Sequence, residues 1–126
     1  MPRDVDNHLI SISRIRKHAA VEISCVRFRG TVRQPTEPEF CSRLDEAGRR
    51  SPHLVVDLSE LEYLSSSGLG MLLDQAGTQE HRGGWLRVIS PSPTVAMILH
   101  LAGASSTLAP FADLEDAVND LPDRAA

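Results

Sequence analysis

The chain has 126 residues, of which 41% are hydrophobic and only 4% are aromatic, so it has the length of one domain with one aliphatic core. Its formal net charge of −4 at pH 7 argues against nucleic acid or an anionic membrane as the main partner. No apolar run approaches the ~20 residues of a membrane-spanning helix, and the start of the chain lacks the hydrophobic region of a signal peptide. We therefore expect a soluble, cytoplasmic protein.

The first half of the chain predicts a loose polar tail, two strands, a loop and a helix. In chain order they occupy residues 1–8, 9–15, 21–29, 31–38 and about 37–50. Alternation of apolar and polar residues defines both strands, and Gly30 ends the second. Two prolines indicate the loop. The helix has acidic residues in its first turn, and Gly48 lies close to its end.

The second half alternates strands and helices. The predicted elements are a strand over 53–58, a helix from the serines at 65–67 to about 82, a strand over 85–89, a helix over 93–102, a weak strand over 107–111, and a helix over 114–121. Gly83 and Gly84 end the second helix, and Asp113 is the expected N-cap of the last. We expect one domain over 9–122 and a short tail over 123–126.

The order β-β-α-β-α-β-α-β-α predicts an α/β fold with a mixed, mostly parallel sheet of four to five strands and about four helices. Strands that alternate with helices favour right-handed crossovers and parallel pairing, with the first strand antiparallel at one edge. In such sheets functional groups gather at the carboxyl ends of the strands. Ser65, Ser66 and Ser67 fall at that position.

The serine turn follows a buried apolar strand and precedes a helix in which Leu69 and Leu72 recur at helical spacing. Such a turn offers unpaired backbone N–H groups and the positive end of a helix dipole, which suits an anion or a serine that becomes one by phosphorylation. Ser66 or Ser67 is alternatively a simple N-cap. Gly68 suits a close backbone approach and Gly70 close helix packing.

Other chemistry finds little support. Leu73 stands where a G-x-G-x-x-G loop would need its third glycine. The five histidines lack metal-ligand spacing, and no G-x-S-x-G motif is present. Cys25 and Cys41 are predicted to be small buried thiols without a disulfide. We expect no enzyme, no metal and no cofactor; a nucleotide-binding role for the turn ranks lowest.

Three stretches carry a family resemblance over roughly residues 9–121: DLSELEYLSSSGLGMLL, GGWLRVISPSPTVAMILHLAG and ADLEDAV. In this order they closely resemble the STAS domain of bacterial anti-sigma-factor antagonists, and the segment before Gly30 resembles that family's second strand. The resemblance implies a STAS-like fold. It also implies a protein that binds an anti-sigma serine kinase, makes it release a sigma factor, and is switched off by phosphorylation.

The resemblance carries the phosphorylated serine over onto Ser66, with Ser65 and Ser67 as alternatives. The contact surface it implies is the turn and the start of its helix. We expect that surface to include Ser65, Ser66, Ser67, Gly68, Leu69, Leu72, Thr31 and Arg33. A phosphatase would restore the binding form. The domain is expected to be a monomer or a weak dimer.

Two positions depart from the family pattern. Ser65 stands where an aspartate usually precedes the phosphorylated serine, and residues 31–33 lack the acidic residue that often follows the second strand. Arg33 could instead pair with a phosphate on Ser66. A second hypothesis therefore stays open: a scaffold or transporter-associated STAS subunit that is never phosphorylated and whose turn belongs to a constitutive interface.

Overall fold

A computed structural model describes residues 8–104, 108 and 110–119. A mixed four-stranded sheet crosses the molecule in the order β1-β2-β3-β4. β1 and β2 pair antiparallel, whereas β2–β3 and β3–β4 pair parallel, which confirms the predicted α/β class. The strands comprise Leu9–His18, Val21–Val32, His53–Leu64 and Trp85–Ile89.

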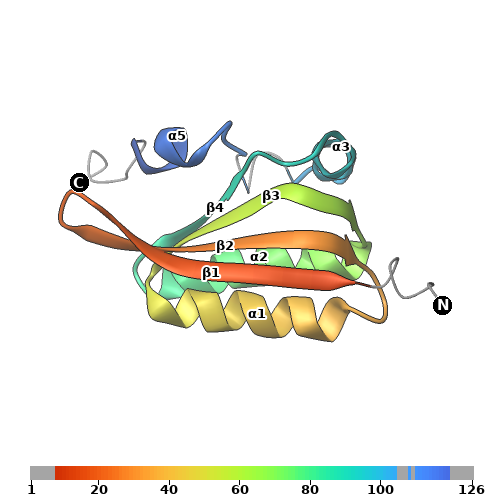
Figure 1. Cartoon of the computed structure of the whole chain (residues 1–126), viewed down its shortest axis with the longest axis horizontal. Helices are drawn as coiled ribbons and strands as arrows, with labels where there is room; N and C mark the ends of the chain where they lie inside the picture. Colours follow the sequence, from red (N-terminus) through yellow and green to blue (C-terminus); the bar gives the residue numbers. More distant parts are fainter. Residues whose placement is uncertain (1–7, 105–107, 109, 120–126) are drawn as a thin grey trace.

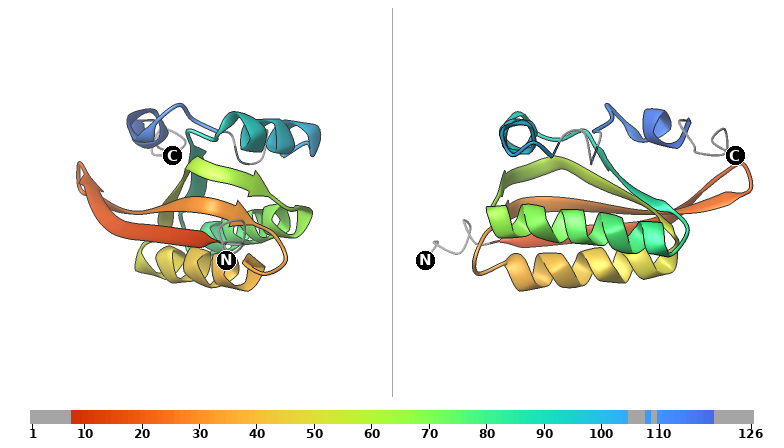
Figure 2. Two further views of the ribbon diagram at one scale, coloured as in Figure 1. Left: turned by 45° about the vertical axis from the view of Figure 1, so that its right-hand side comes forward. Right: turned by 180° about the vertical axis from the view of Figure 1, so that it is seen from behind.

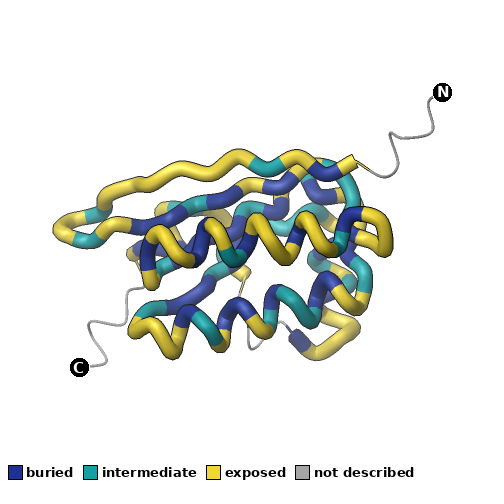
Figure 3. Tube along the Cα trace, turned by 90° about the horizontal axis from the view of Figure 1, so that it is seen from below, coloured by how far each residue is buried: buried dark blue, intermediate teal, exposed yellow. Residues whose placement is uncertain are grey.

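Helices cover both faces of the sheet. α1 (Glu37–Arg50) and α2 (Ser66–His81) lie side by side on one face, and α3 (Pro93–Leu101) and α5 (Leu114–Asn119) lie over the other (Figures 1 and 2). The buried residues of α1 and α2 recur at helical spacing along the side that meets the sheet (Figure 3). Within the described residues, none of the helices combines the length and apolarity needed to span a membrane.

Two apolar clusters hold these layers together. The larger one joins α1 and α2 to the sheet and extends to Val95 and Leu99 of α3. In it the rings of Phe28 and Phe40 meet edge to face, with centroids 4.7 Å apart. The smaller cluster lies on the other face and packs α5 against Ile23, Val55, Trp85 and Ile89. Arg87 strengthens that contact, because its guanidinium lies 4.2 Å from the centre of the Trp85 ring and donates to the carbonyl oxygen of Ala117 in α5.

Both central strands are longer than predicted. β2 continues through Gly30 to Val32, and β3 continues from the predicted Leu58 end to Leu64. Gly30 permits the extension, because it adopts a φ of +115° and a Cβ there would overlap the carbonyl oxygen of His8. Register shifts on either side of Gly30 let the two strands stay paired to their ends.

The C-terminal part differs from the prediction over 107–111. Leu108 is helical, and Phe111 forms a single parallel bridge with Ile89. Residues 107 and 109 lie outside the described residues, as do Leu121 and the tails at 1–7 and 123–126. The predicted cap of the last helix is confirmed, because the Asp113 carboxylate accepts from the Asp116 N–H at 2.9 Å.

The cysteines are free thiols, as predicted. Cys25 in β2 is half-buried, but Cys41 is exposed on α1, so the prediction that both are buried is wrong for Cys41. Position 41 lies on the side of α1 that faces solvent, away from the buried stripe that contains Phe40 and Leu44.

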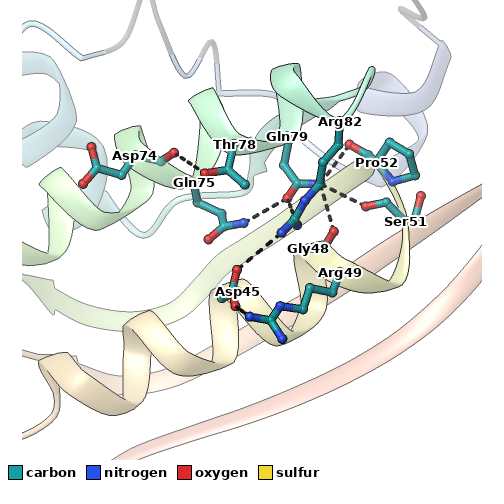
Figure 4. A network of polar contacts seen from close by, with 10 residues as sticks. All are labelled: Asp45, Gly48, Arg49, Ser51, Pro52, Asp74, Gln75, Thr78, Gln79 and Arg82. Carbon is teal, nitrogen blue, oxygen red and sulfur yellow. Dashed lines mark hydrogen bonds and ion pairs between the residues drawn. The ribbon is translucent and has the colours of Figure 1, made fainter.

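A buried amide joins the C-terminal ends of α1 and α2 to the start of β3 (Figure 4). Gln79 has no exposed surface. Its Nε2 donates to the carbonyl oxygens of Gly48 (3.2 Å), Ser51 (2.9 Å) and Pro52 (2.9 Å). Its Oε1 accepts from Gln75 (2.9 Å) and Arg82 (3.1 Å). Gly48 lies inside α1 and makes room for the amide, since a Cβ there would overlap Oε1.

His53 makes the stability of the fold depend on pH. Burial, and secondarily the Arg87 charge, lower the pKa of the imidazole below its usual value of 6.5; its ring centroid lies 5.0 Å from that of Trp85. The folded state therefore takes up the proton less readily than the unfolded chain, and stability is lost as pH falls below about 6.5. In urea unfolding at several pH values between 7 and 5, H53F should show a shallower decline than the natural chain. The exposed control H100Q should keep the natural slope; an unchanged slope in H53F would contradict this assignment.

Candidate functional site

The serine turn lies at the carboxyl edge of the parallel strands, where sequence analysis places it. β3 ends at Leu64 and α2 begins at Ser66. The N–H of Ser65 donates to the carbonyl oxygen of Val32 at the end of β2 (2.9 Å). This hydrogen bond brings the turn before α2 next to the turn that leads from β2 into α1.

Ser65 is the N-cap of α2, so the alternative in which Ser66 or Ser67 is simply the N-cap is wrong. The Ser65 hydroxyl accepts from the Gly68 N–H at 3.1 Å and donates to Oε2 of Glu37 at 2.6 Å. Glu37 is the first residue of α1, so a carboxylate from another helix reaches the turn through space. A hydrogen bond to a charged acceptor is among the stronger kinds, and it occupies the hydroxyl of Ser65.

Ser66 and Ser67 are both exposed. Within the described part of the chain, neither hydroxyl has a recorded hydrogen bond, and the first turn of α2 contains no acidic residue. The positive end of this helix dipole therefore meets solvent without a compensating charge from its own first turn. Two accessible hydroxyls stand at the positive end of the α2 dipole, next to Ser65, which holds the carboxylate of Glu37.

Leu69 and Leu72 do not belong to the exposed surface to which they were assigned. Leu69 is 7% exposed and Leu72 is 0% exposed, and both pack in the larger apolar cluster. Residues at this helical spacing face the sheet, so a partner could not reach Leu72 without displacing α2. The accessible surface of the turn is formed by Ser66 and Ser67.

Gly68 permits a close approach of the α2 backbone to the strands, as predicted, but it is buried, so its assignment to the exposed contact surface is wrong. A Cβ at this position would lie 2.6 Å from Cγ1 of Val32 and 2.8 Å from Cδ1 of Leu64, so the space is limited by side chains of both central strands. At Gly70, in contrast, a Cβ would meet nothing within 4 Å, and its predicted role in helix packing is wrong.

The turn from β2 into α1 is organised by Thr36, which sequence analysis did not single out. Its hydroxyl donates to the carbonyl oxygen of Thr31 at 2.7 Å and accepts from the N–H of Arg33 at 3.1 Å. Thr31 is half-buried in β2, whereas Arg33 is exposed. Among the described residues no ion pair is recorded for Arg33, so an exposed cation lies on the segment that adjoins the serine turn.

Glu37 is the other residue that the sequence did not reveal. It is 28 positions from Ser65, and only the parallel pairing of β2 with β3 brings the starts of α1 and α2 together. Among the described residues no group of three metal-ligating side chains is gathered at this edge or elsewhere. The fold and the turn together define a small α/β domain with an exposed, hydroxyl-bearing helix start.

Comparison with known proteins identifies the family. The family model described as "Mlab, STAS domain" matches residues 15–110, and the chain belongs to the STAS-domain family of anti-sigma factor antagonists. The anti-sigma F factor antagonist of Paenibacillus polymyxa is 31% identical over 80 residues, which span 62% of this chain and 68% of that protein.

Solved structures agree with this assignment. An anti-sigma factor antagonist from Mycobacterium paratuberculosis is 25% identical, with a TM-score of 0.73 over 89% of this chain and 94% of that one. The antagonist SpoIIAA in its unphosphorylated form has a TM-score of 0.66 and 19% identity over 86% and 93% of the two chains. At that identity the likeness is one of fold.

Proposed function

We propose that this protein antagonises an anti-sigma factor, that its partner is an anti-sigma serine kinase bound through the serine turn, and that phosphorylation of Ser66 switches the binding off. The observation that carries the proposal is the exposure of Ser66 at the start of α2, with no recorded hydrogen bond to a described residue. The relatives are named as antagonists of anti-sigma factors, which supports the class of partner.

The hydrogen bonds of the turn favour Ser66 over Ser65 as the acceptor of a phosphoryl group. Ser65 is occupied by Gly68 and Glu37, and phosphorylation there would remove the cap of α2. A cap of this kind contributes about 0.5–2 kcal/mol. Ser66 can be modified without loss of any recorded hydrogen bond. Ser67 is also exposed and remains the alternative.

The proposed switch acts by charge at the surface. A phosphate on Ser66 would add about −1.5 to −2 charges at pH 7. The N-terminus of α2 accepts these charges, and the exposed Arg33 lies on the neighbouring turn, so the domain has no need to unfold. A partner that covers the turn would have to remove water from a dianion. Loss of about 3 kcal/mol at that contact weakens binding more than a hundredfold.

A second candidate function is a constitutive interface without phosphorylation. The observation that favours it is the carboxylate of Glu37, which reaches the turn through Ser65 and would repel an incoming phosphate. On this hypothesis the domain is a scaffold or a transporter-associated STAS subunit.

One labelling experiment separates the two functions. The protein is incubated with ATP and with each candidate anti-sigma kinase, and the phosphorylated residue is located by mass spectrometry. We expect phosphate on Ser66, full loss of labelling in S66A, and retained labelling in S65A if S65A stays folded by circular dichroism. No phosphate on any residue from 65 to 67 with any candidate kinase would favour the constitutive interface.

A further inference from the structure

A groove lies on the face of the sheet opposite α1 and α2, next to the start of α5. It has a volume of about 440 Å³, within the range of small-molecule sites. All four strands and α5 contribute lining residues to it, and Figure 1 shows α5 on that side of the sheet. We call it the Arg14 groove; the residues that matter here are Ile12, Arg14, Cys25, Val55, Ile89 and Leu114.

The floor of the Arg14 groove is apolar. Val55 and Ile89 are 1% and 6% exposed and belong to the smaller core cluster. Ile12 is 61% exposed, so a large aliphatic side chain stands at the mouth without a partner that shields it. The register of the strands places Cys25 between Arg14 and Val55, and the Arg27–Asp57 ion pair between Ile12 and Ile89. The uncharged route across the groove from Arg14 therefore runs over the Cys25 thiol to Val55.

Two arginines line the groove, and one of them is already in an ion pair. Arg27 pairs with Asp57, with Nε 3.3 Å from Oδ2. Asp113 also lines the groove, and its carboxylate accepts from the N–H of Asp116 at the start of α5. For Arg14, in contrast, neither an ion pair nor a hydrogen bond to a described residue is recorded. Its guanidinium can form a bidentate pair with a carboxylate or phosphate group.

The strand pair β1–β2 places arginines opposite apolar residues at several positions. Across β1 and β2 the arginines at positions 14, 16, 27 and 29 lie opposite Cys25, Ile23, Ile12 and Ile10, respectively. Arg27 and Arg29 pair with Asp57 and Glu60 of β3, so of these four arginines Arg14 and Arg16 are the ones left without an ion pair to a described residue. Arg14 is the one that lines the groove, and its apolar neighbours favour an anion with an apolar body.

We propose that the Arg14 groove binds an amphipathic anion, a carboxylate or phosphate monoester with an aliphatic chain. The anionic head pairs with Arg14, and the chain lies over Cys25 and Val55, which follow Arg14 across the sheet. The site is on the face away from α2, so it stands independently of the function proposed for the serine turn.

Cys25 provides the readout, because its thiol lines the groove. Burial raises the pKa of this thiol, so its alkylation should be slow. The rate is measured by mass spectrometry in the C41S protein, in which Cys25 is the one remaining cysteine. The probe is decanoate below its micellar concentration. We expect decanoate to slow the alkylation of Cys25 in a saturable way, and decanol, the neutral counterpart, to require a much higher concentration.

Two arginine variants test the head group. R14Q should raise the decanoate concentration needed for protection about tenfold, the loss expected for one charge-assisted contact. R16Q is the matched control: Arg16 lies two residues along β1 and borders a different hollow, so protection should stay close to that of the parent. The same measurement with decyl phosphate compares a phosphate head group with the carboxylate of decanoate.

Three outcomes would overturn the proposal. The first is no protection of Cys25 by decanoate or decyl phosphate. The second is equal protection in R14Q and R16Q, which would remove the assigned role of Arg14. The third is equal protection of the exposed Cys41 in a C25S protein, which would identify non-specific adsorption.

Discussion

If the partner is the proposed anti-sigma kinase, S66E is expected to weaken its binding by about a hundredfold, and a phosphate on Ser66 by at least as much. Ser66 is exposed at the start of α2, where a bound partner would exclude water from the new charge. The helix dipole accepts that charge in the free domain, so the variant should stay folded. The kinase identified by the labelling experiment is titrated with S66E, and the dissociation constant is measured by calorimetry.

Two variants isolate the position of the charge. S66A should bind the kinase about as well as the natural chain, because it removes a hydroxyl with no recorded hydrogen bond. G77E adds the same charge to α2, at a position where a Cβ meets nothing within 4 Å, and should also bind normally. Equal affinities for S66E and S66A would exclude the turn as the contact.

Removal of the Gln79 side chain in Q79A is expected to lower the free energy of unfolding by about 3 kcal/mol or more. Gln79 is fully buried and receives or donates five hydrogen bonds. In Q79A three backbone carbonyl oxygens lose their shared donor, and a cavity remains between α1 and α2. Urea unfolding of Q79A at pH 7 measures the loss.

Two further variants separate hydrogen bonding from volume. Q79E keeps the size of the side chain but replaces the amide donor by a carboxylate that faces three carbonyl oxygens, so it should destabilise at least as much as Q79A. Q75A removes a single partner of Gln79 and should cost about 1 kcal/mol. Stability of Q79E close to that of the natural chain would contradict the role given to the amide.

The order and type of the elements could be predicted because their patterns are local. Alternation along β1 and β2, helical spacing in α1 and α2, and the glycines after α2 each concern neighbouring residues. The full length of β3 escaped prediction because residues 59–63 are mostly polar and resemble a loop. This segment is held as a strand by pairing with β2, which depends on the unusual φ of Gly30.

The candidate site was predicted in position but not in its hydrogen bonds. The three serines fall at the expected edge of the sheet, but which one caps α2 depends on Glu37, 28 residues away. Leu72 was assigned to the surface although its spacing assigns it to the core, and the structure supports the spacing. The polarity of Gln79 favours a surface position when the sequence is considered alone. Its burial could not be predicted, because the carbonyl oxygens that it binds come together only in the folded chain.

The two hydrogen-bonded ends of α2 have a consequence for kinetics. At its start, Ser65 joins the helix to β2 and α1; at its end, Gln79 joins it to α1 and to Pro52, just before β3. A helix held at both ends is already in its binding conformation, so it loses little conformational entropy when a partner binds. The association rate constant should then depend on diffusion and ionic strength, whereas substitutions in the turn should mainly change the dissociation rate constant.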